Sequence, residues 1–216
     1  MKNYSNYYDI NTSEKITHDG LFLLERSLEG YAGYEVLIND DYTSKVLMYQ
    51  KWDSNGEGKK VIGRIEDIER GNLINHDDEY WLVITKPEDN RIYRKAEVRL
   101  CSSDFPIEQI FEEIEVGTDM LGNPVFESTL IETKYSPCVV EMNTASVAIA
   151  DDNKGINLLD NKIFITIPFI RSDNIKIDKT FIMYDLTYRI IRVDETKSIN
   201  SIGIVSITGE LTGGAE

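Results

Sequence analysis

The chain has 216 residues, of which 41% are hydrophobic and 10% aromatic, and this composition excludes an intrinsically disordered protein. The formal net charge is −15 and both halves of the sequence contribute to it, so tight nucleic-acid binding through a basic groove is excluded. No run approaches the roughly 20 apolar residues that span a bilayer, and we expect no secretory signal.

Residues 1–33 are expected to form an arm followed by one short helix. Tyr4, Tyr7 and Tyr8 lie in a stretch with few charges, which we expect to be ordered only when a partner holds it. Ser13 is a candidate N-cap, and apolar residues then recur at roughly helical spacing until two glycines end the pattern.

From residue 34 the sequence consists of short runs rich in β-branched and aromatic residues, separated by turn residues. One segment, Phe105–Glu113, also permits a short helix because of its proline and the spacing of its apolar residues. The chain is therefore predicted to be mainly β, with two small barrel or sandwich modules and a short N-terminal helix. The predicted strands are Tyr34–Ile38, Lys45–Trp52, Lys60–Ile65, Tyr80–Thr85, Ile92–Leu100, Phe126–Thr133, Pro137–Glu141, Ile163–Phe169, Thr180–Met183, Thr187–Val193 and Gly203–Leu211.

An internal similarity supports two modules. Residues 70–101 and 179–208 each contain a basic residue, a short strand, a turn with aspartate, an aromatic-led strand, a polar turn and a final alternating strand. Each repeat is thus a three-stranded meander. Its two outer strands leave backbone hydrogen-bonding groups unpaired, so we expect it to curl into a barrel with the strands that precede it. The predicted modules are 34–104 and 137–216, joined by a linker or docking insertion at 105–136. The alternative is chance, because short strands with polar turns resemble one another.

No motif in the sequence marks a catalytic, cofactor or metal site. Residues 55–60 resemble a phosphate-binding loop, but the first glycine and the hydroxyl residue of that motif are missing. The acidic turn at 151–155 lacks the ligand spacing of a calcium loop. His18 and His76 have no second His or Cys at ligand spacing, and no nucleophile motif accompanies them. We therefore predict that the protein is not an enzyme and holds no cofactor.

Cys101 and Cys138 are the two cysteines of the chain. They show no metal-ligand spacing, and in a reducing cytosol we expect two free thiols rather than a disulfide.

The sequence offers a set of candidate residues for contacts between subunits. Aromatic and methionine side chains give contact area at low entropic cost, and several lie in the arm and in the 105–136 segment, among acidic residues. The alternative is that many of them complete the cores of the two modules. The candidate interface residues are Tyr4, Tyr7, Tyr8, Phe105, Phe111, Met120, Leu121 and Phe126.

Several stretches of the sequence together resemble head–tail connector and head-closure proteins, the stopper-type neck proteins of tailed phages of Gram-positive bacteria. The stretches are Arg64–Ile74 (RIEDIERGNLI), Tyr80–Ile84 (YWLVI), Tyr93–Cys101 (YRKAEVRLC), Asp119–Val125 (DMLGNPV), Lys179–Ile182, Thr187–Asp194 and Gly203–Thr208. These motifs are structural and carry no catalytic residues.

The resemblance implies a homo-oligomeric ring in the virion neck, assembled in the host cytoplasm. Its partners would be portal or adaptor proteins on one side and tail proteins on the other, with no membrane contact. Such a ring seals the packaged DNA, which passes through without tight binding. Two alternatives stay open. The protein could be another tail or baseplate component, or a bacterial β-rich ligand-binding module, which a deep pocket of converging carboxylates and aromatics would favour.

Overall fold

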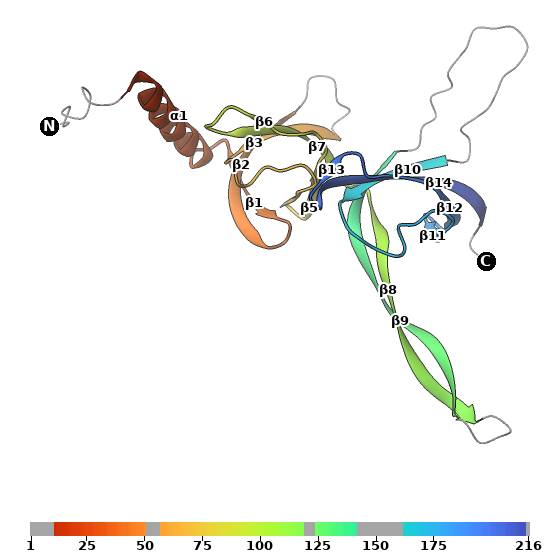
Figure 1. Ribbon diagram of the computed structural model, residues 1–216. Helices are drawn as coiled ribbons and strands as arrows, with labels where there is room; N and C mark the ends of the chain where they lie inside the picture. Colours follow the sequence, from red (N-terminus) through yellow and green to blue (C-terminus); the bar gives the residue numbers. More distant parts are fainter. Residues whose placement is uncertain (1–10, 51–56, 119–123, 142–161, 215–216) are drawn as a thin grey trace, which may run out of the picture. The chain divides into compact units, whose positions relative to one another are not determined.

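A computed structural model describes residues 11–50, 57–118, 124–141 and 162–214 (Figure 1). For 111–118, 124–130 and 214 only the backbone is described. The protein is mainly β, as predicted, and divides into two compact units, Met1–Leu100 and Cys101–Glu216.

The strands of the first unit form one antiparallel sheet that closes on itself. Their order is β3-β2-β1-β4-β5-β7, and β3 also pairs with β7, so the sheet is a barrel. The short β6 pairs with the start of β7. The strands are β1 (Gly33–Ile38), β2 (Tyr42–Gln50), β3 (Gly58–Gly63), β4 (Leu73–His76), β5 (Glu79–Val83), β6 (Glu88–Asp89) and β7 (Arg94–Leu100).

Alternate residues of these strands fill the barrel, as a sheet with one buried face requires. Ile68, on the loop between β3 and β4, is also fully buried and packs into this core. The loop can approach because Gly63 has no side chain: a Cβ there would lie 2.9 Å from Ile68 Cγ1. The buried core is Val36, Ile38, Val46, Val61, Ile68, Ile74, Trp81, Val83, Ala96 and Val98.

The predicted helix is present as α1 (Thr12–Leu28). Its N-cap is Asn11 rather than Ser13, because the Asn11 side chain accepts a hydrogen bond from the Ser13 backbone N–H. Leu24 and Leu28 are the buried residues of the helix.

The second unit is also a single antiparallel sheet, of order β11-β12-β14-β10-β9-β8, with β13 paired to β14. Its strands are β8 (Ser103–Thr118), β9 (Pro124–Glu141), β10 (Lys162–Pro168), β11 (Thr180–Met183), β12 (Leu186–Asp194), β13 (Ser198–Ile199) and β14 (Ile202–Gly214). Its buried core is Phe105, Cys138, Ile163, Ile165, Ile167, Ile175, Phe181, Met183, Tyr188, Ile190, Val205 and Ile207.

The two units share one topology. The order β4-β5-β7-β3-β2-β1 in the first matches β11-β12-β14-β10-β9-β8 in the second, strand for strand in chain order. Ile175, on the loop before β11, is buried in its core as Ile68 is before β4. The first meander hairpin has a two-residue turn with positive φ in both units, at Asp77-Asp78 and Tyr184-Asp185, as type I′ turns do. The predicted repeat is therefore present, and it extends over all the main strands.

The segment between the predicted modules differs from expectation. Residues 105–113 form part of β8 and not a helix, and 105–136 is no separate linker, because it supplies strands of the second sheet. The predicted strands Phe126–Thr133 and Pro137–Glu141 are parts of β9. Pro106 is tolerated in β8 because β8 is an edge strand of the second sheet. A proline has no backbone N–H, and on an edge strand only one neighbouring strand can be affected by its absence.

Candidate assembly interface

The units differ in how their sheets end. In the first, β1 pairs with β4 through Leu37↔Asn75 and Ile38↔Ile74, which closes the barrel. The corresponding strands of the second unit, β8 and β11, are the two ends of its sheet, and no pairing between their described residues joins them. The second barrel therefore has a seam between β8 and β11.

Side chains rather than ladder hydrogen bonds bridge this seam. The rings of Phe105 on β8 and Phe181 on β11 lie 5.1 Å apart, and Phe181 stacks on Tyr188. The Ser172 hydroxyl donates a hydrogen bond to the Ile107 carbonyl of β8. Phe105 is fully buried here. Its ring packs in the core of the second unit, which is the alternative the sequence left open for the candidate interface residues.

A polar groove lies beside β8 next to this seam. Its volume is about 360 Å³, and its walls come from β8 and from the loop before β11. Glu108 on the rim pairs with Lys134 of β9 at 2.9 Å, and this hydrogen bond raises the pKa of Lys134. The pair is more than half exposed, so it orients the rim and adds little stability. The groove is lined by Ile107, Glu108, Gln109, Ile170, Arg171, Ser172, Asp173 and Asn174.

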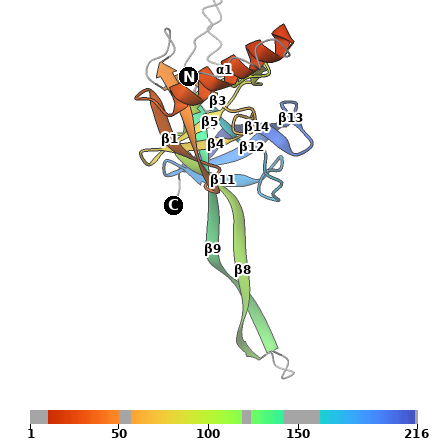
Figure 2. The ribbon, with the colours of Figure 1, turned by 90° about the vertical axis from the view of Figure 1, so that its left-hand side faces the viewer.

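The β8–β9 hairpin is the longest element pair of the described structure. The two strands pair from Ser103↔Cys138 to Thr118↔Pro124, whereas β10 pairs with β9 only at Val139–Glu141. Beyond the sheet the hairpin is thus a two-stranded ribbon with an unpaired edge on each side (Figures 1 and 2). From Ile107 to Thr118, at about 3.3 Å per residue, this ribbon is about 35 Å long.

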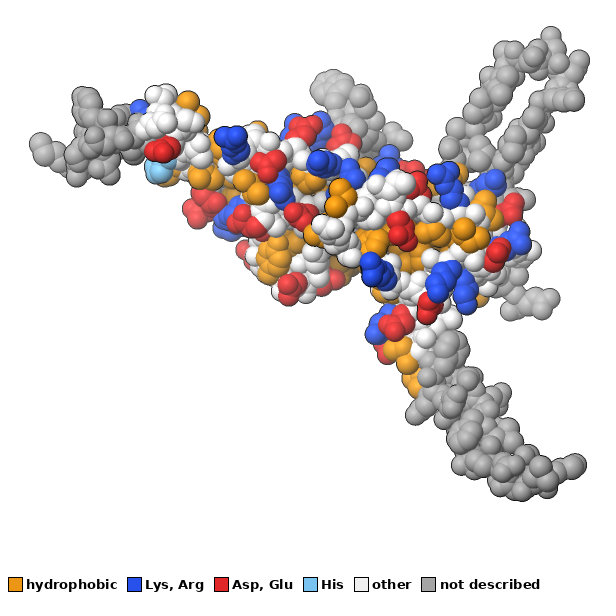
Figure 3. Space-filling model, viewed as in Figure 1, with side chains coloured by type: hydrophobic (Ala, Val, Ile, Leu, Met, Phe, Trp, Pro, Cys, Tyr) orange, Lys and Arg blue, Asp and Glu red, His pale blue; other side chains and the backbone are white. Residues whose placement is uncertain are grey.

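Exposed apolar side chains accompany the base of the hairpin. Ile131 is 58% exposed and Tyr135 is 60% exposed, both on β9. The sequence from 105 to 136 also carries seven acidic residues and one lysine. Elsewhere acidic and basic side chains are interspersed on the face seen in Figure 3. Long ribbons with unpaired edges and apolar flanks are typical of surfaces that pair with another chain.

The other predicted interface residues are placed only in part. Phe111 and Phe126 lie on the distal hairpin, where Phe111 pairs with Leu130 and Phe126 with Glu115 in the backbone register. The remaining candidates lie outside the described residues: Tyr4, Tyr7, Tyr8, Met120 and Leu121.

The sequence reasoning missed an apolar surface on α1. Ile16, Leu21, Phe22 and Leu23 are exposed. At about 100° per residue, Phe22 and Leu23 fall outside the stripe that buries Leu24. A count of apolar residues off the buried stripe could have detected this surface.

An ion pair fastens α1 to the first barrel. Arg64 donates two hydrogen bonds to the carboxylate of Glu25, at 2.8 and 2.7 Å. These hydrogen bonds and the charge of Arg64 lower the pKa of Glu25. On the other side of Arg64, the buried Asp67 accepts a hydrogen bond from the Ser44 hydroxyl. The arrangement is structural, since each group has a partner within the unit.

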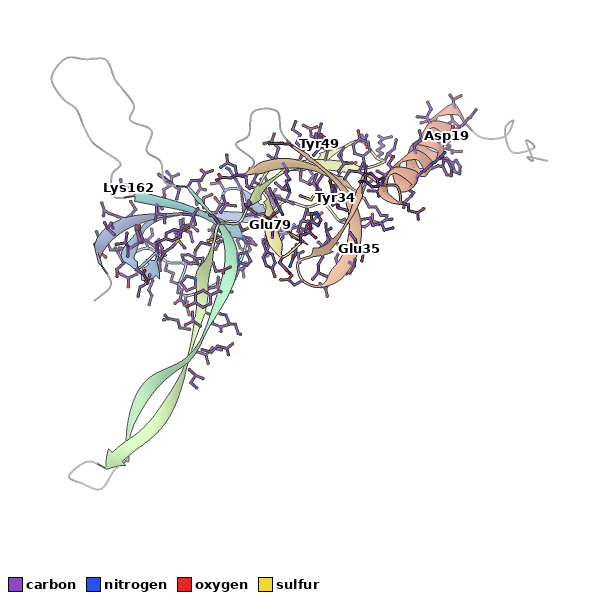
Figure 4. All side chains as sticks on the ribbon, turned by 180° about the vertical axis from the view of Figure 1, so that it is seen from behind. Asp19, Tyr34, Glu35, Tyr49, Glu79 and Lys162 are labelled. Carbon is purple, nitrogen blue, oxygen red and sulfur yellow. The ribbon has the colours of Figure 1, made fainter. Side chains whose placement is uncertain are left out.

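The described residues contain no group of three or more His, Cys, Asp or Glu side chains able to hold a metal ion. Each histidine meets one neighbouring carboxylate at 3.5 Å, His18 with Asp19 on α1 and His76 with Asp77. The ring of His76 lies 4.9 Å from that of Tyr34, which Figure 4 labels on the first barrel. Within the ranges the structure covers, no helix is long and apolar enough to cross a membrane.

The two cysteines are free thiols. Cys138 is buried at the base of β9, and burial raises the pKa of its thiol. Cys101 is only half-buried. The buried Cys138 thiol therefore lacks the accessible, electropositive surroundings of a nucleophile.

Comparison with known proteins gives matches over nearly the whole chain. Residues 6–100 match the YomX N-terminal domain and residues 105–210 the YomX C-terminal domain, a division that agrees with the two units. The "SPbeta prophage-derived uncharacterized protein YomX" of Bacillus subtilis (strain 168) is 30% identical over 213 residues, covering 97% of each chain. Among solved structures, K. pneumonia MrkH is 7% identical with a TM-score of 0.21, and the match covers 91% of this chain and 84% of that chain.

Proposed function

The chain belongs to the YomX family, and from this we propose that it is a structural protein of a tailed-phage particle. Two observations support the proposal. The related protein of B. subtilis is described as prophage-derived, and the second β-unit carries a long hairpin whose strand edges are unpaired beyond the sheet.

More specifically, we propose that copies of the chain form a homo-oligomeric ring in the neck of the particle. The ring would join the portal or adaptor to the tail and seal the packaged DNA. The observation that carries this proposal is the β8–β9 hairpin, whose two edges have no partner beyond the sheet. A contact between different surfaces of identical subunits closes into a ring when the rotation allows it.

The charge of the chain suits contact with DNA that must move. A net charge of −15, with seven acids in the 105–136 segment, repels phosphates, so a duplex would pass without tight binding. The groove beside β8 has no aromatic side chain among its lining residues, which weakens the alternative of a ligand-binding module.

Two measurements test the proposal. Light scattering and electron microscopy of the purified chain should show a ring of defined copy number. Antibody labelling of phage particles should place the protein at a symmetric collar between head and tail. Labelling at the distal end of the tail would favour the alternative of a baseplate component. A monomer at all concentrations and salt conditions, together with absence from particles, would refute the structural role.

A further inference from the structure

The β8–β9 hairpin has one unpaired edge on each of its two strands. On β8 the free edge runs from Glu108 to Thr118, and on β9 from Pro124 to Pro137. An unpaired backbone edge presents a row of N–H and C=O groups that another strand can complete. An isolated two-stranded ribbon is also marginally stable in water. Strands of 16 and 18 residues are far longer than the usual five or six, so this ribbon needs partners.

We propose that the hairpins of neighbouring copies pair edge to edge, β8 of one copy with β9 of the next, and that the paired hairpins close into a cylindrical sheet. This inference rests on the proposed ring and names the contact that builds it. When hairpins point the same way, β9 of one copy runs antiparallel to β8 of the next. The pairing therefore continues the antiparallel arrangement of every strand pair in the second unit.

A second copy of the chain is the occupant that satisfies both edges at once. A foreign strand on β8 would leave the edge of β9 open, and the reverse holds as well. A copy presents a β9 edge to β8 on one side and a β8 edge to β9 on the other. When the same contact is repeated around a ring, every hairpin edge is paired with a neighbour. A closed β-barrel removes unpaired strand edges in the same way.

The area of one contact indicates that rings, and not dimers, are the stable form. A strip about 35 Å long and about 10 Å high buries on the order of 350 Å² on each copy, or about 700 Å² in total. That is below the roughly 1,200 Å² of a stable specific interface. Each copy in a closed ring has two such contacts and reaches this threshold. Assembly should therefore be cooperative, with few dimers between monomers and rings.

The charge of the hairpin gives the pairing a recognisable salt dependence. Like charges on neighbouring strands repel, and the 105–136 segment is strongly acidic. At about 0.15 M salt the Debye length is about 8 Å, and higher salt shortens it. Added salt should therefore favour rings of this chain. Binding of a basic partner to the same hairpin would instead weaken with salt.

Disulfide trapping between two differently tagged chains tests the contact directly. Both chains carry Cys101→Ser. One adds Gln109→Cys on β8, and the other adds a single cysteine on β9 at Thr129, Ile131 or Thr133, since strand tilt in a cylinder shifts the register by a few residues. Neither chain holds both engineered cysteines, and the native Cys138 is buried. A disulfide between Gln109→Cys and the β9 cysteine therefore forms only between copies.

The matched control replaces the β9 cysteine by Ile182→Cys on β11, an exposed position outside the hairpin. We expect at least one β9 position to give a tenfold higher yield of mixed disulfide than Ile182→Cys, with the yield rising with salt. Rings of the parent chain in which no β9 position exceeds the control would overturn the edge pairing and leave the proposed function standing. A parent chain that never assembles would overturn both.

Discussion

Shortening the β8–β9 hairpin should separate assembly from folding. In the proposed variant, residues 111–131 are replaced by Asn-Gly, which joins Ile110 to Glu132. These two residues face each other in the hairpin register, so a two-residue turn can connect them. All described core residues of the second unit lie outside the removed segment.

The structure gives the size of the expected effect. The variant removes the eight residues from Phe111 to Thr118 from each β8 edge. With about one hydrogen bond per residue and a net 0.5–1.5 kcal/mol for each, one contact loses about 4–12 kcal/mol. The lower figure already corresponds to about a thousand-fold weaker association. Folding should change little, with the unfolding midpoint within about 4 °C of the parent chain.

Sedimentation velocity over a range of concentrations measures the assembly, and circular dichroism measures the unfolding midpoint. The control variant Ile182→Ser changes an exposed residue of β11 and should assemble like the parent chain. A shortened chain that forms rings at the same concentration as the parent would show that the hairpin edges do not hold the copies together. A shortened chain that fails to fold would show instead that the hairpin is part of the core.

Other variants test the first unit. Ile68→Ala removes a fully buried side chain and should lower the free energy of unfolding by about 2–5 kcal/mol in urea titration. Glu25→Ala releases α1 from the barrel and leaves Arg64 beside the buried Asp67. Because the pair of Glu25 with Arg64 is a third or more exposed, thermal unfolding should show a loss of at most about 1 kcal/mol. The pKa of Glu25 is lowered in the folded state, so its stabilising contribution is full above its ordinary pKa and is lost as the pH falls through the folded-state value. Acid titration should therefore destabilise the parent chain more than Glu25→Gln, and equal acid sensitivity would contradict this account. Lys59 lies 3.9 Å from the ring of Trp81, and Lys59→Met should cost about 0.5–2 kcal/mol and change the tryptophan fluorescence.

The strand-rich architecture could be predicted because alternation of apolar residues is a local signal. Most strands fall within a few residues of their predicted bounds, and Thr180–Met183 agrees at both ends. The meanders were recognisable for the same reason, since their turns and strands follow one another in sequence. The first three strands of each unit carry no shared motif, so their common order appears only in the structure.

The β8–β9 hairpin could not be predicted because its strands are interrupted by bulges. Register shifts occur between Pro106 and Glu108, Ile110 and Phe111, and Glu115 and Gly117. Two of these shifts place an extra residue in β8 and one places it in β9. An extra residue breaks the two-residue period, so apolar residues of β8 recur at spacings of three and four and imitate a helix. The seam between β8 and β11 was equally hidden, because it depends on whether two strands distant in sequence fail to pair.

The environment of the two thiols bears on how the protein survives oxidation. Thiolate is the form that reacts, and burial keeps Cys138 protonated at neutral pH. The half-buried Cys101 is thus the position where an oxidant should act first. Under oxidising conditions the buried thiol of β9 at the base of the long hairpin should therefore stay unmodified while Cys101 reacts.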